Sequence, residues 1–207
     1  TTIYKRDTAS VPNVTFKYAV TAGAAQDASD GNLAVLAGDD KVTSTGLPTI
    51  KDIVFTANDT KDDGLADDGL FIKKTGTVDF SKVTYKEPGV YRYVVTETGG
   101  AQGVTHEDKA HKKEDRTKAL DVYVTDDGTG KLVVSGYVMH DDENATQKLK
   151  GYNKDTNFEH LLTTSDVTLS KKVTGNQGSR DEYFKFTVNI KGADKGTKFI
   201  LTYQMLT

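Results

Sequence analysis

The chain has 207 residues, 36% of them hydrophobic and 28% charged, which is the composition of a globular protein with one large or two small domains. Its net charge of −3 combines 27 basic with 30 acidic residues, so we expect no extended basic surface and no nucleic-acid partner. The absence of cysteine excludes disulfides, thiolate catalysis and cysteine-based zinc sites, and the abundance of Tyr, Phe, Val and Thr predicts an all-β protein.

The first predicted strands lie near the start of the sequence. Residues 1–7 form a short strand candidate that carries Lys5, and residues 14–20 follow after a Pro-Asn turn with alternating apolar side chains. We expect these two strands to pair as a β-hairpin. Residues 24–45 are rich in Gly, Asp, Ala and Ser and predict a loop or a weak edge strand.

The middle of the chain contains the clearest strand. Residues 90–97 follow a Pro-Gly turn and alternate so that three aromatic or apolar side chains share one face with Glu97. Strands are also predicted at residues 53–56 and 77–85. Residues 58–69 are acidic and polar but do not fit the EF-hand spacing, so they predict a solvated loop.

The later elements follow the same alternating pattern. Residues 119–124 and 131–138 flank an Asp-Asp-Gly turn and predict a second hairpin. Residues 156–162 are the last strand expected in a first domain that spans residues 1–162. Residues 99–116 have no apolar period, so they predict a solvated connector.

Residues 163–207 repeat the opening plan of the chain. A strand with Lys171, a Gly-containing turn and an aromatic alternating strand follow one another, as they do near Lys5. This echo predicts two copies of one β fold in tandem, with the second copy incomplete. We expect the incomplete domain to self-associate or to be completed by strands of another chain, because exposed strand edges recruit partners.

The segment V-D-F-S-K-V-T-Y-K-E-P-G-V-Y-R-Y-V-V-T-E, residues 78–97, resembles the FctA-like major (backbone) pilins, or T-antigens, of Gram-positive bacteria. The resemblance implies an all-β fold of tandem Ig-like or CnaB-like β-sandwich domains. It also implies a structural subunit of a cell-surface pilus or adhesin stalk, rigidified by autocatalytic Lys-Asn isopeptide bonds, with no cofactor and no enzymatic role. It implies an extracellular, cell-wall-anchored location. An adhesin module that binds host protein or carbohydrate through its long loops is the alternative.

The resemblance also implies the roles of particular residues. Lys5 corresponds to the lysine of the isopeptide bond and Glu97 to the acid that promotes it, whereas His160 stands where the acceptor Asn is expected. Asn157 is the nearby acceptor candidate, but alternation turns it away from the side of His160 unless the register shifts. Lys171 corresponds to the lysine of a second bond whose partners are absent.

Assembly with other pilin subunits through a sortase is a further implication. The family's linking lysine follows a Gly-Tyr pair, and here Val138 occupies that position, so Lys148, Lys150 and Lys154 are the substitute candidates. The sequence has no apolar run that could cross a bilayer and no sorting signal, so we expect no membrane span and no anchor within it.

No metal site is predicted from the spacing of potential ligands. The four histidines are scattered, and none shares a predicted element with another histidine or carboxylate at ligand spacing. A hydrolase with paired carboxylates would require two facing acids in a cleft, and no nucleophile motif occurs.

Overall fold

A computed structural model describes residues 1–5, 9, 11–28, 33–59, 71–108, 110–113, 116–141 and 154–164, together with residues 169, 174, 185 and 187–189. These residues form strands and loops with no helix among them, which confirms the all-β prediction. Within these ranges, then, there is no helix with the length and apolar character that a membrane span requires.

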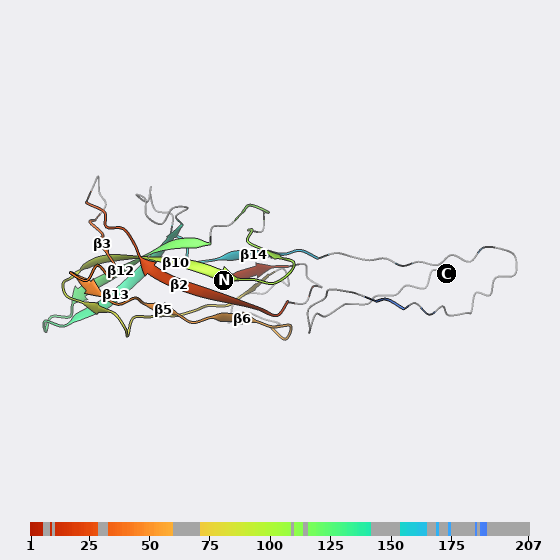
Figure 1. Cartoon of the computed structure of the whole chain (residues 1–207), viewed down its shortest axis with the longest axis horizontal. Coiled ribbons are helices and arrows are strands. Elements are labelled where there is room, and N and C mark those ends of the chain that lie inside the picture. Colours follow the sequence, from red (N-terminus) through yellow and green to blue (C-terminus); the bar gives the residue numbers. More distant parts are fainter. Residues whose placement is uncertain are drawn as a thin grey trace.

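The smaller sheet has four strands in the order β11-β14-β1-β7. Figure 1 shows its strand β14 beside the N-terminal end of the chain. Its strands are β1 (Thr2–Tyr4), β7 (Phe71–Lys73), β11 (Val104–Thr105) and β14 (Glu159–Leu162). β1 lies in the middle, parallel to β14 and antiparallel to β7. The first described strand and the last one are therefore neighbours.

The larger sheet has six strands, in the order β13-β12-β10-β2-β6 with β3 also paired to β10. Its strands are β2 (Val14–Ala22), β3 (Leu36–Ala37), β6 (Ile53–Phe55), β10 (Gly89–Gly99), β12 (Thr117–Asp126) and β13 (Leu132–Asp141). Two short ladders join β4 (Ser44–Thr45) to β9 (Thr84–Tyr85) and β5 (Thr49–Ile50) to β8 (Val78–Asp79).

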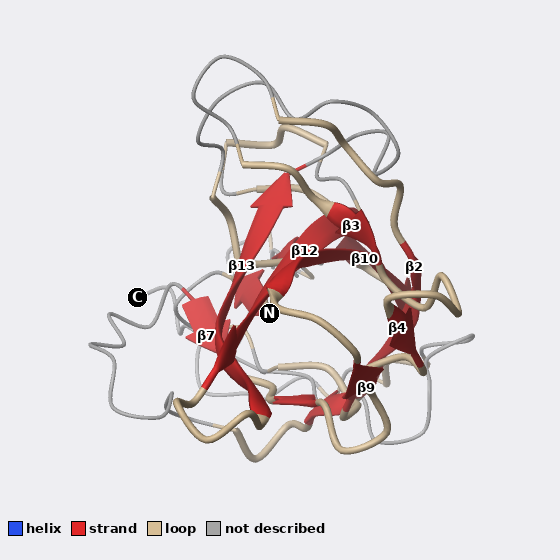
Figure 2. Ribbon diagram, turned by 90° about the vertical axis from the view of Figure 1, so that its left-hand side faces the viewer, coloured by secondary structure: helices blue, strands red, loops and turns tan. Residues whose placement is uncertain are grey.

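The two sheets pack face to face as a β-sandwich. Ile3 and Ile72 from the smaller sheet share one buried cluster with Phe16 and Phe55 from the larger sheet. A second cluster lies under β10 and β12 and includes Phe158, which comes just before β14. Figure 2 shows the strands arranged around this interior. Burial of these apolar side chains supplies the main stabilisation of the fold, at about 25 cal/mol per Å² of apolar surface.

The predicted hairpin between residues 1–7 and 14–20 is wrong. β1 belongs to the smaller sheet and β2 to the larger one, where β2 pairs with β10 and β6. The connection carries the buried Val11 and leads into the buried Val14, so it passes from one sheet to the other. Alternation of side chains defines the buried face of a strand, but it does not identify the strand that pairs with it.

The second predicted hairpin is confirmed. β12 and β13 pair antiparallel, with a bulge at Tyr123 and Val124 that adds one residue to the β13 side. In the turn, Asp126 and Asp127 accept hydrogen bonds from the backbone amides that follow them. These Asx turns explain why an Asp-Asp-Gly sequence reverses the chain here.

Several short strands depart from the predictions. Residues 77–85 divide into β8 and β9, and each pairs with a short strand from residues 44–50. β7 follows the acidic loop and was not predicted, and β11 lies inside the segment predicted as a solvated connector. Strands of two or three residues are too short to show a period of two, so their sequences give no clear signal.

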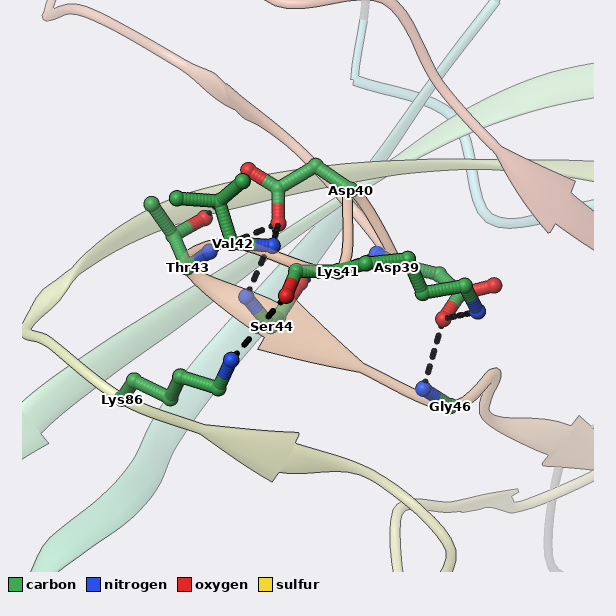
Figure 3. A network of polar contacts seen from close by, with 8 residues as sticks. All are labelled: Asp39, Asp40, Lys41, Val42, Thr43, Ser44, Gly46 and Lys86. Atoms are coloured by element: carbon green, nitrogen blue, oxygen red, sulfur yellow. Dashed lines mark hydrogen bonds and ion pairs between the residues drawn. The ribbon is translucent and has the colours of Figure 1, made fainter.

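Hydrogen bonds within one segment hold the loop that precedes β4 (Figure 3). One carboxylate oxygen of Asp40 accepts bonds from the backbone amides of residues 42–44 at 2.8, 2.7 and 3.0 Å. These bonds, that from Ser44 first, lower the pKa of Asp40 to about 2. The Lys86 ammonium bonds the carbonyl of Lys41 at 3.0 Å and ties the loop to the end of β9. The loop is therefore a defined turn.

A buried ion pair lies on the face of β10 opposite its aromatic side chains. Arg92 donates from Nε and Nη2 to the two carboxylate oxygens of Asp121, each at 2.7 Å, and Nη1 reaches Gln26 at 3.0 Å. His140 lies 3.2 Å from the same carboxylate. Burial disfavours the charged form of Asp121, but the bonds and charges of Arg92 and His140 outweigh it and hold its pKa below the ordinary value.

Residues 163–207 lie almost entirely outside the described residues. The division into domains at residues 162 and 163, and the incomplete second domain, therefore stay predictions.

We predict that Asp121→Ala destabilises the domain by about 3–5 kcal/mol, because it leaves the Arg92 guanidinium buried without its carboxylate. Urea unfolding measures the loss. The double variant Arg92→Met with Asp121→Leu should regain most of it, since an apolar pair of similar volume can replace a buried ion pair. Asp27→Asn, at an exposed carboxylate, is the control and should change stability by less than about 0.5 kcal/mol. A loss at Asp121 no larger than that of the control would contradict the role assigned to the pair.

Candidate functional site

Glu97 lies near the end of β10, on the face that the sequence assigned to it. Tyr91, Tyr93 and Val95 precede it on this face and are fully buried, and the Glu97 side chain is 0% exposed. Its register partner in the larger sheet is Tyr18 of β2. The predicted aromatic face of β10 is therefore confirmed, and it ends in a carboxylate inside the sandwich.

His160 meets Glu97 from the opposite sheet. It is the second residue of β14 and the register partner of Ile3 in β1. Its Nε2 atom lies 2.8 Å from Oε1 of Glu97, and its side chain is 1% exposed. The imidazole also stacks on the ring of Phe16, with centroids 4.2 Å apart and planes 15° apart. The ring is thus held between an aromatic face and a carboxylate.

His106 completes the group from the edge of the smaller sheet. β11 pairs with β14 through Val104 with Leu162 and Thr105 with Leu161, and one further step of this register brings His106 beside His160. The two imidazole rings lie 4.7 Å apart and inclined by 70°. Nδ1 of His106 is 3.9 Å from Oε1 of Glu97, and the side chain is 22% exposed.

Burial, followed by the neighbouring His160 and Arg116, lowers the pKa of His106 to about 4. The imidazole of His106 is therefore neutral at pH 7. One ligand atom from each of Glu97, His106 and His160 lies within 4.8 Å of the other two. Prediction from spacing along single strands missed this cluster, because its members come from three segments that only the folded sheets bring together.

The other carboxylate oxygen of Glu97 contacts hydroxyl groups. The Thr1 hydroxyl donates to Oε2 at 3.1 Å and also lies 2.5 Å from the Tyr18 hydroxyl. Burial, and then the charge of Glu97, raises the pKa of Tyr18 far above its ordinary value, so Tyr18 stays protonated. Among the described residues, Oε1 of Glu97 and both ring nitrogens of His160 have no well-aligned hydrogen bond. A short distance alone does not satisfy them.

Lys5 follows β1 and is half-buried. Alternation along the strand from Thr1 and Ile3 predicts that its side chain shares their side, toward the interior. By strand alternation, Asn157 lies on the side of its segment opposite to Phe158 and His160. Its amide accepts a bond from the Thr2 hydroxyl at 3.0 Å and donates to Glu159 at 2.9 Å. The isopeptide roles of Lys5 and Asn157 therefore stay predictions, and a bond to Asn157 would need a shifted register.

The structure describes only one of the other candidate lysines. Lys148, Lys150 and Lys171 lie outside the described residues, and so does most of the acidic loop at residues 58–69. Lys154 is exposed and forms an isolated bridge with His140 next to the end of β13.

Lys118 is a buried amine that the sequence analysis did not single out. Its ammonium contacts Asp141 and lies 2.7 Å from Asp155, and it lies 5.2 Å from the centre of the Phe158 ring. Burial favours the neutral amine, but the two carboxylates outweigh it and raise the pKa of Lys118. A lysine that stays protonated is no nucleophile, so this group is a structural ion pair.

We predict a pH effect that belongs to His106. As the pH falls from about 6.5 to about 4, the unfolded chain takes up a proton that the folded site excludes, so His106 lowers the free energy of unfolding across this window. His106→Asn removes this contribution, and the variant should therefore gain stability relative to the parent as the pH falls. Urea unfolding at several pH values in metal-free buffer measures the difference. His111→Asn alters an exposed histidine of the same loop and should show no such trend; parallel curves for parent and His106→Asn would contradict the prediction.

Comparison with known proteins gives consistent matches. A curated relative named "Pilin", from Streptococcus pyogenes serotype M1, is 28% identical over 128 residues, or 61% of this chain and 34% of the relative. The structure of the major pilin protein T-13 from Streptococcus pyogenes is 20% identical with a TM-score of 0.46 and covers 79% of this chain and 51% of its own. For the T3.2 major pilin of the same species the values are 23%, 0.45, 77% and 49%.

The chain thus spans about one third of the curated relative and about half of each solved chain. The match to a family is broader, because residues 4–158 fit the family described as "FctA: Spy0128-like isopeptide containing domain". This range holds the whole larger sheet with Glu97, and it ends just before β14 of the smaller sheet. The chain therefore belongs to the FctA family of isopeptide-containing domains.

Proposed function

We propose that this chain is a structural part of a pilus subunit on the surface of a Gram-positive bacterium, with no enzymatic role toward external substrates. The observation that carries the proposal is the family match over residues 4–158 on a β-sandwich whose central strand ends in a buried glutamate. The similarity to a streptococcal pilin supports it. The absence of cysteine also fits, because such a shaft domain must gain durability without disulfides.

The chemistry of an isopeptide bond explains why a buried glutamate is useful. A neutral lysine amine attacks the amide carbon of an asparagine, and ammonia leaves after proton transfers that an adjacent protonated carboxyl group can relay. The buried position of Glu97 between the sheets supports that role, and Lys5 follows β1 on the side predicted to face it. An imidazole has neither an amide carbon nor a leaving amine, so His160 accepts no such bond.

We therefore propose that the first domain keeps the glutamate of the isopeptide apparatus but has no acceptor beside it. Asn157 is engaged by Thr2 and Glu159 on the opposite side. Lys171 is proposed as the lysine of a second site whose partners lie in another segment or another chain. Partners of the subunit are further pilin copies, a sortase during assembly, and chains that complete the strands of residues 163–207.

We predict that the parent chain forms no Lys-Asn bond within residues 1–162. Its intact mass should therefore show no loss of ammonia from this domain. His160→Asn places an amide beside Glu97 and should lower the mass by one ammonia, with tandem fragments linking Lys5 to residue 160. Adding Glu97→Ala or Lys5→Arg to that variant is the control and should restore the full mass. A parent chain already short of one ammonia, with Lys5 linked to Asn157, would contradict the proposal, and so would an unchanged mass in the His160→Asn variant.

Assembly gives a separate prediction. If Lys148, Lys150 or Lys154 receives the sorted end of the next subunit, the triple Lys→Arg variant of the full-length protein should lose most of its polymerisation by sortase, because Arg keeps the charge but offers no nucleophilic amine. Gel analysis of the polymer ladder measures the loss. Lys51→Arg, at an exposed lysine distant in sequence, is the matched control. Undiminished polymers in the triple variant would remove these lysines as candidates.

A further inference from the structure

The geometry points to a binding site for a divalent transition-metal ion, with Zn²⁺ as the best fit, formed by Glu97, His106 and His160. This inference does not rest on the proposed pilus function. It concerns a group of side chains that the isopeptide chemistry uses only in part, since neither histidine has a role in that reaction.

The positions of the ligand atoms suit a metal with short bonds. Tetrahedral zinc binds nitrogen and carboxylate oxygen at about 2.0–2.2 Å, which places neighbouring ligand atoms about 3.3 Å apart. In the site, Oε1 of Glu97 lies 2.8 Å from His160 and 3.9 Å from His106, and all three ligand atoms lie within 4.8 Å of one another. The two distances from Glu97 bracket the required value, and movements of the histidine side chains by about 1 Å would complete the site.

Unsatisfied polar atoms provide a second, independent observation. Buried polar groups almost always have hydrogen-bond partners. Within the described part of the chain, Nδ1 of His160 has no hydrogen-bond partner, and Nε2 of His160 and Oε1 of Glu97, although 2.8 Å apart, form no well-aligned bond; both side chains are at least nine-tenths buried. A bound cation would satisfy the carboxylate oxygen and one ring nitrogen together. An unpaired polar group costs the most free energy where water is excluded, as it is around these two side chains.

The surrounding side chains hold the ligands in place. The Thr1 hydroxyl donates to the carboxylate oxygen of Glu97 that does not face the histidines, and Phe16 fixes the plane of His160 by stacking. Such supporting contacts orient ligands and tune affinity. Three protein ligands leave one coordination position for water, which can enter past the partly exposed His106.

The chemistry of the donors selects the ion. Two imidazoles and one carboxylate suit Zn²⁺, Cu²⁺ or Ni²⁺, whereas Mg²⁺ and Ca²⁺ prefer oxygen ligands throughout. A bound ion would connect β10 of the larger sheet with β14 and the residue after β11 of the smaller sheet. It would therefore fasten the two layers of the sandwich to each other.

Zinc binding to the whole chain, first stripped with a chelator, tests the proposal. We expect one zinc ion per chain in native mass spectrometry, a rise in the melting temperature with ZnCl2 and none with MgCl2, and the visible absorption of tetrahedral cobalt when Co²⁺ is used. His106→Asn should weaken zinc binding about ten-fold or more, and it should fold, since His106 lies at the edge of the sheet.

The matched control is His111→Asn. His111 belongs to the same loop and lies 3.6 Å from Glu107, but it is exposed and outside the cluster, so its replacement should leave binding unchanged. His160→Asn provides a second variant within the site and should also lose the cobalt spectrum. The proposal is overturned if no stoichiometric ion binds, if His106→Asn binds zinc as tightly as the parent, or if only His111→Asn loses binding.

Discussion

A carboxylate enclosed between two β-sheets is the constraint on which this domain depends. Burial of an ionised Glu97 without partners would cost several kcal/mol of folding free energy. Its neighbours must therefore compensate its charge or form hydrogen bonds with it. Thr1 donates to one oxygen, and His160 and His106 face the other. Thr1, β14 and the residue after β11 therefore all meet the larger sheet at the same point.

Each face of β10 carries a buried charged side chain, and the two charges are compensated in different ways. On one face, Arg92 and Asp121 pair bidentately and directly opposite each other in the ladder, so their charges are internally matched. On the other face, the charge of Glu97 meets imidazoles whose nitrogens are incompletely bonded. The first arrangement is closed and structural. The second leaves a carboxylate oxygen and ring nitrogens that can still bind a proton or an ion.

Several strands and the position of Glu97 could be predicted from local sequence patterns. Alternation along residues 90–97 placed Glu97 on the aromatic face of its strand, and the Asp-Asp-Gly turn predicted the pairing of β12 with β13, because both signals lie within a few residues. The pairing of β1 with β14 could not be found in this way, since its partners are more than 150 residues apart. The metal-ligand geometry of His106 depends on β11, a strand of two residues without a readable period. Long-range register is therefore the information that the local sequence lacks.

The parallel contact between β1 and β14 has a mechanical consequence. Strands that run in the same direction side by side are pulled in opposite directions when a chain is stretched from its two ends. Tension along this domain would therefore load their ladder in shear, together with the bond from the Thr2 amide to the Phe158 carbonyl at 2.9 Å. In that geometry the hydrogen bonds resist as a group and must break nearly together, whereas in an unzipping geometry they would fail one after another. The parallel direction of β1 and β14 thus gives the domain resistance to force without a covalent crosslink.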